Sequence, residues 1–225
     1  CKPLYTRKGI GANDAARYAL DNFDTIMAKC DAWDEKILED AKKTDTEGYD
    51  EIVSASWRQT WSAHKLIVTP SGAPALLSKE NDSNGCIGTV DVSYPSIPIF
   101  LKYCPELVNA MCLPVLEFAD MPVWEYDFAP HDVGRYPNAT GQVYGRKAVP
   151  TASVGRGESH LPYYMFPAGT DLYNFNMQMP VEECGNMLIM MYAATQYGAS
   201  DELCKKYRHH LDKWVKYLLE YGEDP

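Results

Sequence analysis

The feature that most constrains this chain is a long run without a charged side chain, residues 184–200. Within it, residues 187–194 are apolar around the whole circumference of a helix, which is typical of a helix enclosed by other helices. A helix that crosses a bilayer needs about 20 predominantly apolar residues, and Asn186, Thr195 and Gln196 interrupt this run. We therefore predict an inner helix of a helical domain and no membrane span.

An outer helix is predicted directly after the inner one, over residues 201–221. Gly198 can end the inner helix, and Ser200 can cap the next. The apolar residues of the second segment form one stripe: Leu203, Tyr207, Leu211, Trp214, Val215 and Leu218. We expect His209 and His210 on the solvent face. Alternating inner and outer helices build a barrel, so the expected fold class is mainly α, an incomplete α/α-hairpin toroid with its cleft at the ends of the inner helices.

The remaining segments extend this prediction to one helical-hairpin domain over residues 1–225. Apolar residues at spacings of three and four predict helices over 13–41, 49–61, 93–103 and 106–118, with a short β-hairpin excursion near 65–78. From residue 121 to 179 the periodicity is lost, and Pro, Gly, Asn, His and Tyr dominate. Loops of this length in a compact domain are often functional.

Composition excludes some classes of partner. The net charge of −10 argues against nucleic acid, because a polyphosphate would meet a repulsive field. Sixteen Tyr and five Trp suit a cleft for a small-molecule or carbohydrate substrate. The seven cysteines contain no CxxC pair, so we expect neither a zinc ribbon nor a dense disulfide scaffold, and we interpret most of them as small buried hydrophobes.

A pair of glutamates stands at the start of the inner helix. Pro180 suits the first helical position, and Glu182 and Glu183 in the first turn can simply complement the helix dipole. Alternatively, one of them projects into the cleft as a general acid or base. Adjacent helical residues lie about 100° apart, so we expect only one to face the cleft.

The long loop carries the other candidate catalytic residues, His131 and Asp132. Either a carboxylate orients His131 for proton transfer, or the two residues hold the loop through hydrogen bonds. With Asp127 they could offer metal ligands, but the spacing is not diagnostic, so we expect no metal and no cofactor. Cys184 could act as a nucleophile beside His131, although a buried cysteine is the commoner case.

Candidate substrate-binding residues are drawn from the loop and from two helix starts. Asp91 either caps the helix that follows it or points into the cleft, and Asn138 either forms a turn after Pro137 or contacts substrate. The complete set is Asp91, Tyr94, Asp127, Tyr136, Asn138 and Asn186.

Three blocks of sequence resemble a known family. They are GTVDVSYPSIPIFLKYCPELVNAMCLPVLEFA (88–119), HDVGRYPNATG (131–141) and MPVEECGNMLIM (179–190), and their order matches the fungal and bacterial glutaminase A family. The resemblance implies a six-hairpin helical domain that hydrolyses the side-chain amide of L-glutamine, and an extracytoplasmic protein. Family members are longer, so it also implies a central part of a multidomain chain that packs against N- and C-terminal regions of the same polypeptide.

The working hypothesis is a glutaminase-like amidohydrolase. One carboxylate would activate water against the amide carbonyl, while a second acid or His131 protonates the departing ammonia. Two alternatives stay open. One is a glycoside hydrolase with paired carboxylates, for which a separation of about 5–5.5 Å or about 6.5–9.5 Å indicates retaining or inverting chemistry. The other is a non-catalytic helical module that binds a ligand or another domain.

Overall fold

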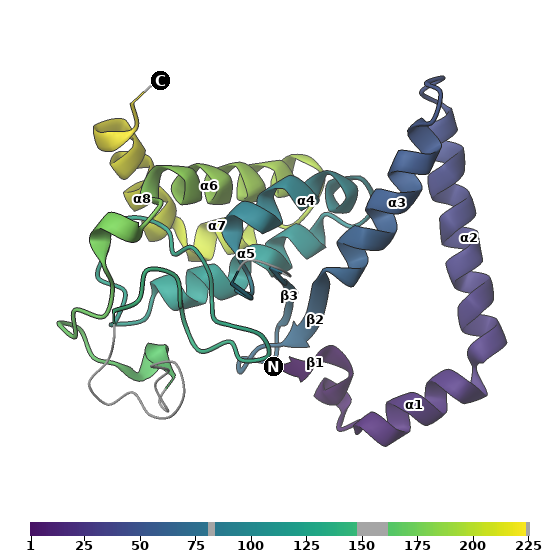
Figure 1. Ribbon diagram of the computed structural model, residues 1–225, viewed down its shortest axis with the longest axis horizontal. Helices are drawn as coiled ribbons and strands as arrows, with labels where there is room; N and C mark the ends of the chain where they lie inside the picture. Colours follow the sequence, from purple (N-terminus) through teal and green to yellow (C-terminus); the bar gives the residue numbers. More distant parts are fainter. Residues whose placement is uncertain (81–83, 148–161, 224–225) are drawn as a thin grey trace.

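The computed structural model describes residues 1–80, 84–147 and 162–223. The described part is mainly helical, with a small three-stranded sheet (Figure 1). Its helices are α1 (Ala12–Asp21), α2 (Phe23–Lys42), α3 (Tyr49–Ser62), α4 (Val90–Tyr103), α5 (Glu106–Ala119), α6 (Pro180–Gln196), α7 (Glu202–Lys206) and α8 (Arg208–Tyr221). The predicted mainly α class is confirmed.

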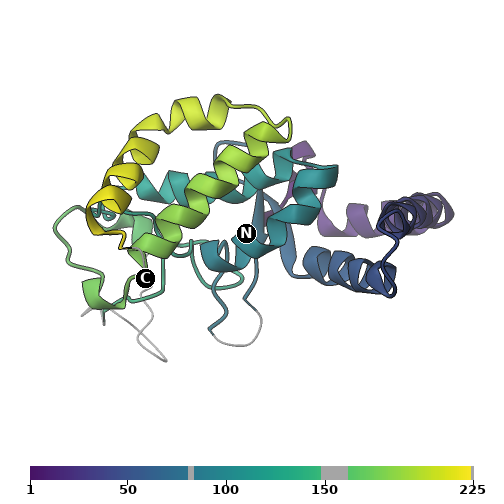
Figure 2. The ribbon, with the colours of Figure 1, turned by 90° about the horizontal axis from the view of Figure 1, so that it is seen from above.

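The inner helix α6 is the centre of the helical body. It packs against α4, α5 and α8, and it buries Met187, Met190, Met191 and Ala194. Seen from above, α7 and α8 curve back beside α6, while α1 and α2 extend away on the other side (Figure 2). The arrangement reproduces the predicted succession of an inner and an outer helix.

One face of α6 departs from the prediction. Ile189 and Tyr192 are exposed, Tyr192 to 67%. The expectation of burial on every side is therefore wrong for this face within the described residues. An all-round apolar sequence shows that a helix can be enclosed, but it does not show which neighbours enclose it.

Two helices predicted as continuous are each divided in the structure. Asn22 takes a non-helical conformation between α1 and α2, and its side-chain amide donates to the Tyr18 carbonyl. Tyr207 similarly divides α7 from α8 and is itself buried. Helices α2 and α3 pack against each other, although α2 buries only Ile37 and Ala41.

The sheet matches the predicted excursion near 65–78. Strands β1 (Lys2–Pro3), β2 (His64–Val68) and β3 (Pro74–Ser78) are antiparallel in the order β1-β2-β3. Ala75, Leu76 and Leu77 are almost completely buried, and α5 packs against β3. The sheet thus contributes β3 to the hydrophobic core, where β3 packs against α4 and α5.

The loop between α5 and α6 is fixed to the segment that leads into α4. The amide of Ile87 donates to the Gly134 carbonyl at 2.9 Å, and the amide of Val133 donates back to Ile87 at 3.0 Å. The amide of Val90 donates to the His131 carbonyl at 2.9 Å. This pairing brings His131 beside the first turn of α4.

No helix in the described ranges combines the length and the apolar character that crossing a bilayer requires.

Candidate active site

Glu183 lies in the first turn of α6 and is only 1% exposed. Within the described part of the chain, neither of its carboxyl oxygens has a hydrogen-bond partner. Burial raises the pKa of Glu183 to about 10, and the negative charges of Asp91, Glu182 and Asp132 add to this effect. The side chain is therefore a neutral carboxylic acid at neutral pH.

Asp91 and His131 complete a cluster with Glu183. One carboxyl oxygen of Asp91, one carboxyl oxygen of Glu183 and one ring nitrogen of His131 all lie within 4.8 Å of one another. The His131 Nε2 to Asp91 Oδ1 distance is 3.9 Å, which is longer than a hydrogen bond. The Asp91 side chain is 32% exposed, whereas His131 is buried, so Asp91 forms the solvent side of the cluster.

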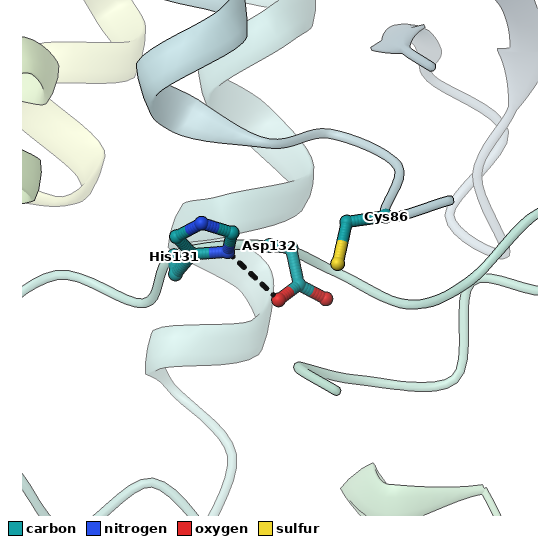
Figure 3. Close-up of side chains that lie close together, drawn as sticks. All are labelled: Cys86, His131 and Asp132. Atoms are coloured by element: carbon teal, nitrogen blue, oxygen red, sulfur yellow. Dashed lines mark hydrogen bonds and ion pairs between the residues drawn. The ribbon is translucent and has the colours of Figure 1, made fainter. Parts of the chain in front are cut away.

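Asp132 fixes the orientation of the His131 ring (Figure 3). Asp132 Oδ2 lies 3.0 Å from His131 Nδ1, and the fully buried carboxylate also accepts the amides of Gly134, Val143 and Tyr144 at 2.9, 2.9 and 3.1 Å. Because a carboxylate can only accept, Nδ1 carries a proton and donates it to Asp132, and Nε2 faces Asp91. The ring also stacks on Tyr144, with centroids 4.2 Å apart.

Gly134 is needed for this geometry. Its φ of +147° is unfavourable for other residues, and an added Cβ would lie 2.2 Å from the Asn138 carbonyl oxygen. The HDVG sequence therefore folds back tightly enough for Asp132 to receive the amide of Gly134.

Three further residues of the site were not foreseen from the sequence. Gln142 is fully buried and accepts the His131 amide at 2.7 Å. The Cys86 thiol lies beside Asp132 (Figure 3), and burial raises its pKa, so it is not a thiolate. The pKa of Glu80 is raised by burial and then by Asp91. These residues reach the site through contacts between distant segments, for which the sequence carries no local signal.

Of the two glutamates, only Glu183 belongs to the cluster. Glu182 is exposed one position earlier in the same turn. Asn186 is buried one turn further along α6, and Tyr94 is half-buried against the core. Substrate contacts by Asn186 and Tyr94 stay predictions.

Three other predicted residues lie at the surface, outside the cluster. Asp127 is exposed and pairs with Lys213 at 3.2 Å. Tyr136 is 53% exposed, with the Lys79 ammonium 5.8 Å from its ring centroid. Asn138 is exposed, and its backbone N–H donates to the Arg135 carbonyl in a turn. Their proposed roles in substrate binding stay predictions.

Cys184 has the environment of a structural cysteine. Its side chain is fully buried, and its Sγ accepts the Ala129 amide at 3.3 Å. Burial raises the pKa of the thiol to about 12. A thiolate nucleophile is not available there at neutral pH. Of the other cysteines, Cys86 and Cys112 are buried, Cys204 is half-buried, and Cys1, Cys30 and Cys104 are exposed, so the expectation that most are buried is wrong.

Two groups of possible metal ligands include His131. In the group with Cys86 and Asp132, the Asp132 oxygens already accept several hydrogen bonds, which leaves them poor ligands. In the group with Asp91 and Glu183, the glutamate would first have to lose its proton. Acid–base chemistry is therefore the simpler use of the cluster.

An aromatic groove of about 470 Å³ lies elsewhere, between α2, α3 and the end of α4. Trp33, Trp57, Trp61 and Tyr103 line it together with Asp34. It lacks the acid–histidine pairing found at the start of α6, so we place the chemistry at the cluster.

Fold and site together define a helical-hairpin domain with a buried acid–histidine cluster at the end of its inner helix. The family model for the glutaminase A six helical-hairpin domain matches residues 46–225, and the chain belongs to the glutaminase A family.

Two curated relatives were compared along the chain. Glutaminase A of Aspergillus oryzae is 34% identical over 188 residues, which cover 83% of this chain and 23% of the relative. A probable glutaminase of Arthroderma benhamiae is 30% identical over 190 residues, covering 84% of this chain and 19% of the relative. The chain thus spans about a fifth of the length of these relatives. No solved structure matches the chain significantly.

Proposed function

We propose that this domain hydrolyses the side-chain amide of L-glutamine to glutamate and ammonia. The names of the two relatives support this substrate. The observation that carries the proposal is the buried, neutral Glu183 within 4.8 Å of both Asp91 and His131. Burying a carboxyl group without a hydrogen-bond partner among the described residues is costly, which favours a chemical role for Glu183 over a packing role.

Asp91 acts as the general base in the first step. As the solvent side of the cluster, it can hold a water molecule against the amide carbonyl carbon. Water oxygen bonds to that carbon as Asp91 accepts a water proton, and the carbonyl π electrons move to the oxygen. The product of this step is a tetrahedral intermediate.

Glu183 acts as the general acid in the second step. It gives its proton to the amide nitrogen, the C–N bond breaks, and ammonia leaves together with a carboxylic acid. These two products then exchange a proton to become ammonium and glutamate. The proton held on Asp91 returns to Glu183 through His131 Nε2, which resets the cluster.

The remaining parts of the proposal concern the whole protein. We infer that it acts outside the cytoplasm and that further segments of the same polypeptide cover the exposed face of α6. The greater length of the relatives and the exposed Ile189 and Tyr192 support the second inference.

The test compares Glu183→Gln with Glu182→Gln in the full-length protein. A glutamine side chain in place of Glu183 would keep the shape and neutrality of the acid but could not donate the acidic proton, so kcat for ammonia release from L-glutamine should fall by about 10²–10⁴-fold. The exposed neighbour should change kcat by less than about threefold. Equal activity of the two variants would remove Glu183 from catalysis.

The same proteins are assayed for release of reducing sugar from oligosaccharides. Sugar release that depends on Glu183, without ammonia release, would replace the amidohydrolase proposal with the glycoside hydrolase alternative. If the wild-type protein releases neither ammonia nor reducing sugar, the result would support the non-catalytic module.

A further inference from the structure

A second cluster of titratable side chains lies outside the proposed active site. Asp120 follows the last residue of α5, and His209 and His210 lie in the first turn of α8. His209 Nε2 and His210 Nε2 lie 2.8 and 2.7 Å from the same atom, Asp120 Oδ1. The expectation that both histidines face solvent is wrong for His210, which is buried.

The geometry is that of three converging ligand atoms. If the two contacts are hydrogen bonds, each Nε2 carries a proton, and both Nε2–H groups donate to the same oxygen, Asp120 Oδ1. A metal ion could replace both protons. Bonds of about 2.0–2.2 Å to imidazole nitrogen and carboxylate oxygen place neighbouring ligand atoms about 3–3.5 Å apart, so the present contacts need to lengthen by only a few tenths of an ångström.

Packing fixes one ligand and leaves the other two accessible. The His210 side chain is 7% exposed, and its ring stacks between those of Tyr207 and Trp214, at centroid distances of 6.3 and 5.6 Å. The His209 and Asp120 side chains are 57% and 44% exposed. An ion could therefore enter from solvent and keep one or more water ligands.

The chemistry of the donors selects the class of ion. Two imidazoles and one carboxylate suit Zn²⁺, Cu²⁺, Ni²⁺ or Co²⁺, whereas Ca²⁺ and Mg²⁺ prefer sites built from oxygen. Lys213, three residues beyond His210 in α8, would repel a bound cation, but its ammonium is paired with Asp127 at 3.2 Å.

We propose that Asp120, His209 and His210 bind one divalent transition-metal ion, which ties the C-terminal end of α5 to the first turn of α8. The site shares no residue with the cluster around Glu183. Its proposed role is structural or regulatory, and this role does not depend on whether the domain hydrolyses glutamine.

The experiment titrates the metal-free 225-residue chain with Zn²⁺ by calorimetry and with Co²⁺ by visible absorption. We expect one Zn²⁺ per chain, a higher Tm, and Co²⁺ ligand-field bands without the near-ultraviolet charge-transfer band of a thiolate ligand. In His209→Gln, an exposed substitution, the affinity should fall at least about tenfold while the Tm of the metal-free protein is retained.

Glu183→Gln is the matched control, because it alters one of the two groups of possible ligands that include His131 but none of these three residues. It should bind Zn²⁺ like the wild-type chain. The proposal is overturned if the wild-type chain binds no Zn²⁺, if His209→Gln binds as tightly as wild type, if Glu183→Gln abolishes binding, or if Co²⁺ gives the thiolate band.

Discussion

Burial decides what Glu183 can do, because two effects oppose each other in the first turn of α6. The helix N-terminus favours a negative charge by about 0.3–1 kcal/mol. Glu183 has no hydrogen-bond partner among the described residues, so loss of hydration disfavours that charge much more strongly, and the pKa of Glu183 is raised to about 10. The pattern of a proline followed by two acids predicts helix capping equally for both glutamates, and only the structure separates the exposed from the buried one.

The pH dependence of stability should report this burial. The pKa of Glu183 is near 4.5 when unfolded and about 10 when folded, so between these values the folded state holds a proton that the unfolded state has lost. Its contribution to stability is complete below pH 4.5 and declines as pH rises towards 10, by up to about 1.4 kcal/mol per pH unit. Glu183→Gln should remove this slope from the free energy of unfolding, measured in urea across that range.

Glu182→Gln serves as the control and should retain the slope. Equal slopes in the wild-type protein and Glu183→Gln would mean that Glu183 is ionised in the folded state.

Asp132 is the most heavily hydrogen-bonded side chain of the site. Asp132→Asn would replace one carboxylate oxygen with an amide NH₂, which would face either the N–H groups of Gly134 and Val143 or the N–H of Tyr144, so at least one buried donor would lose its acceptor. We expect a loss of about 2–4 kcal/mol in the free energy of unfolding, measured by urea denaturation. Asp127→Asn, at an exposed ion pair, should change it by less than about 0.5 kcal/mol, and a similar small effect at Asp132 would contradict the assigned network.

At the scale of elements, periodicity predicts which segments are helical and where most of them begin and end, but it misses breaks within a segment. The inner helix α6 and the hairpin of β2 and β3 follow the predicted ranges closely. The breaks at Asn22 and Tyr207 were missed because each interrupts a continuous apolar stripe without proline or glycine, and a local conformation ends the helix there.

The loop that carries His131 depends on its glycine. Gly134→Ala would combine an unfavourable φ with a methyl group 2.2 Å from a carbonyl oxygen, and we expect a loss of more than about 2 kcal/mol in the free energy of unfolding. Gly72→Ala is the matched control, since Gly72 has a φ of +86° but no atom within 4 Å of the added methyl, and it should lose about 1 kcal/mol. Equal losses for the two variants would show that the tight turn after Asp132 is not as close as described.

At the scale of the whole molecule, the exposed apolar side chains on one face of α6 are typical of a surface that another segment covers. Tyr192→Lys should change the free energy of unfolding of the 225-residue chain by less than about 0.5 kcal/mol. If further segments of the polypeptide cover α6 as proposed, the same substitution in a chain that includes them should lower it by about 1–3 kcal/mol, because Tyr192 is then buried. Chemical denaturation of both proteins distinguishes these outcomes, and a small effect in each would leave the face open to solvent.

The helical class could be predicted from the charge-free run and the apolar periodicity, and the family could be predicted from three sequence blocks. The composition of the site could be read only in part. Glu183, His131, Asp132 and Asp91 were named from their local sequence, whereas Glu80, Cys86 and Gln142 enter through contacts between the sheet, the loop and α4. Such contacts depend on the tertiary fold, and no local pattern encodes them.

The protonation state of Glu183 is the claim on which the proposed chemistry depends, and it can be measured directly. Carbon-13 NMR of the protein labelled at glutamate side-chain carboxyl carbons, with Glu183→Gln used to assign the signal, would follow this group from pH 4 to 10. A chemical shift that stays at the protonated value up to about pH 9 is the expected result. A midpoint near 4.5 would contradict it, because Glu183 would then be ionised at neutral pH and could not act as the acid.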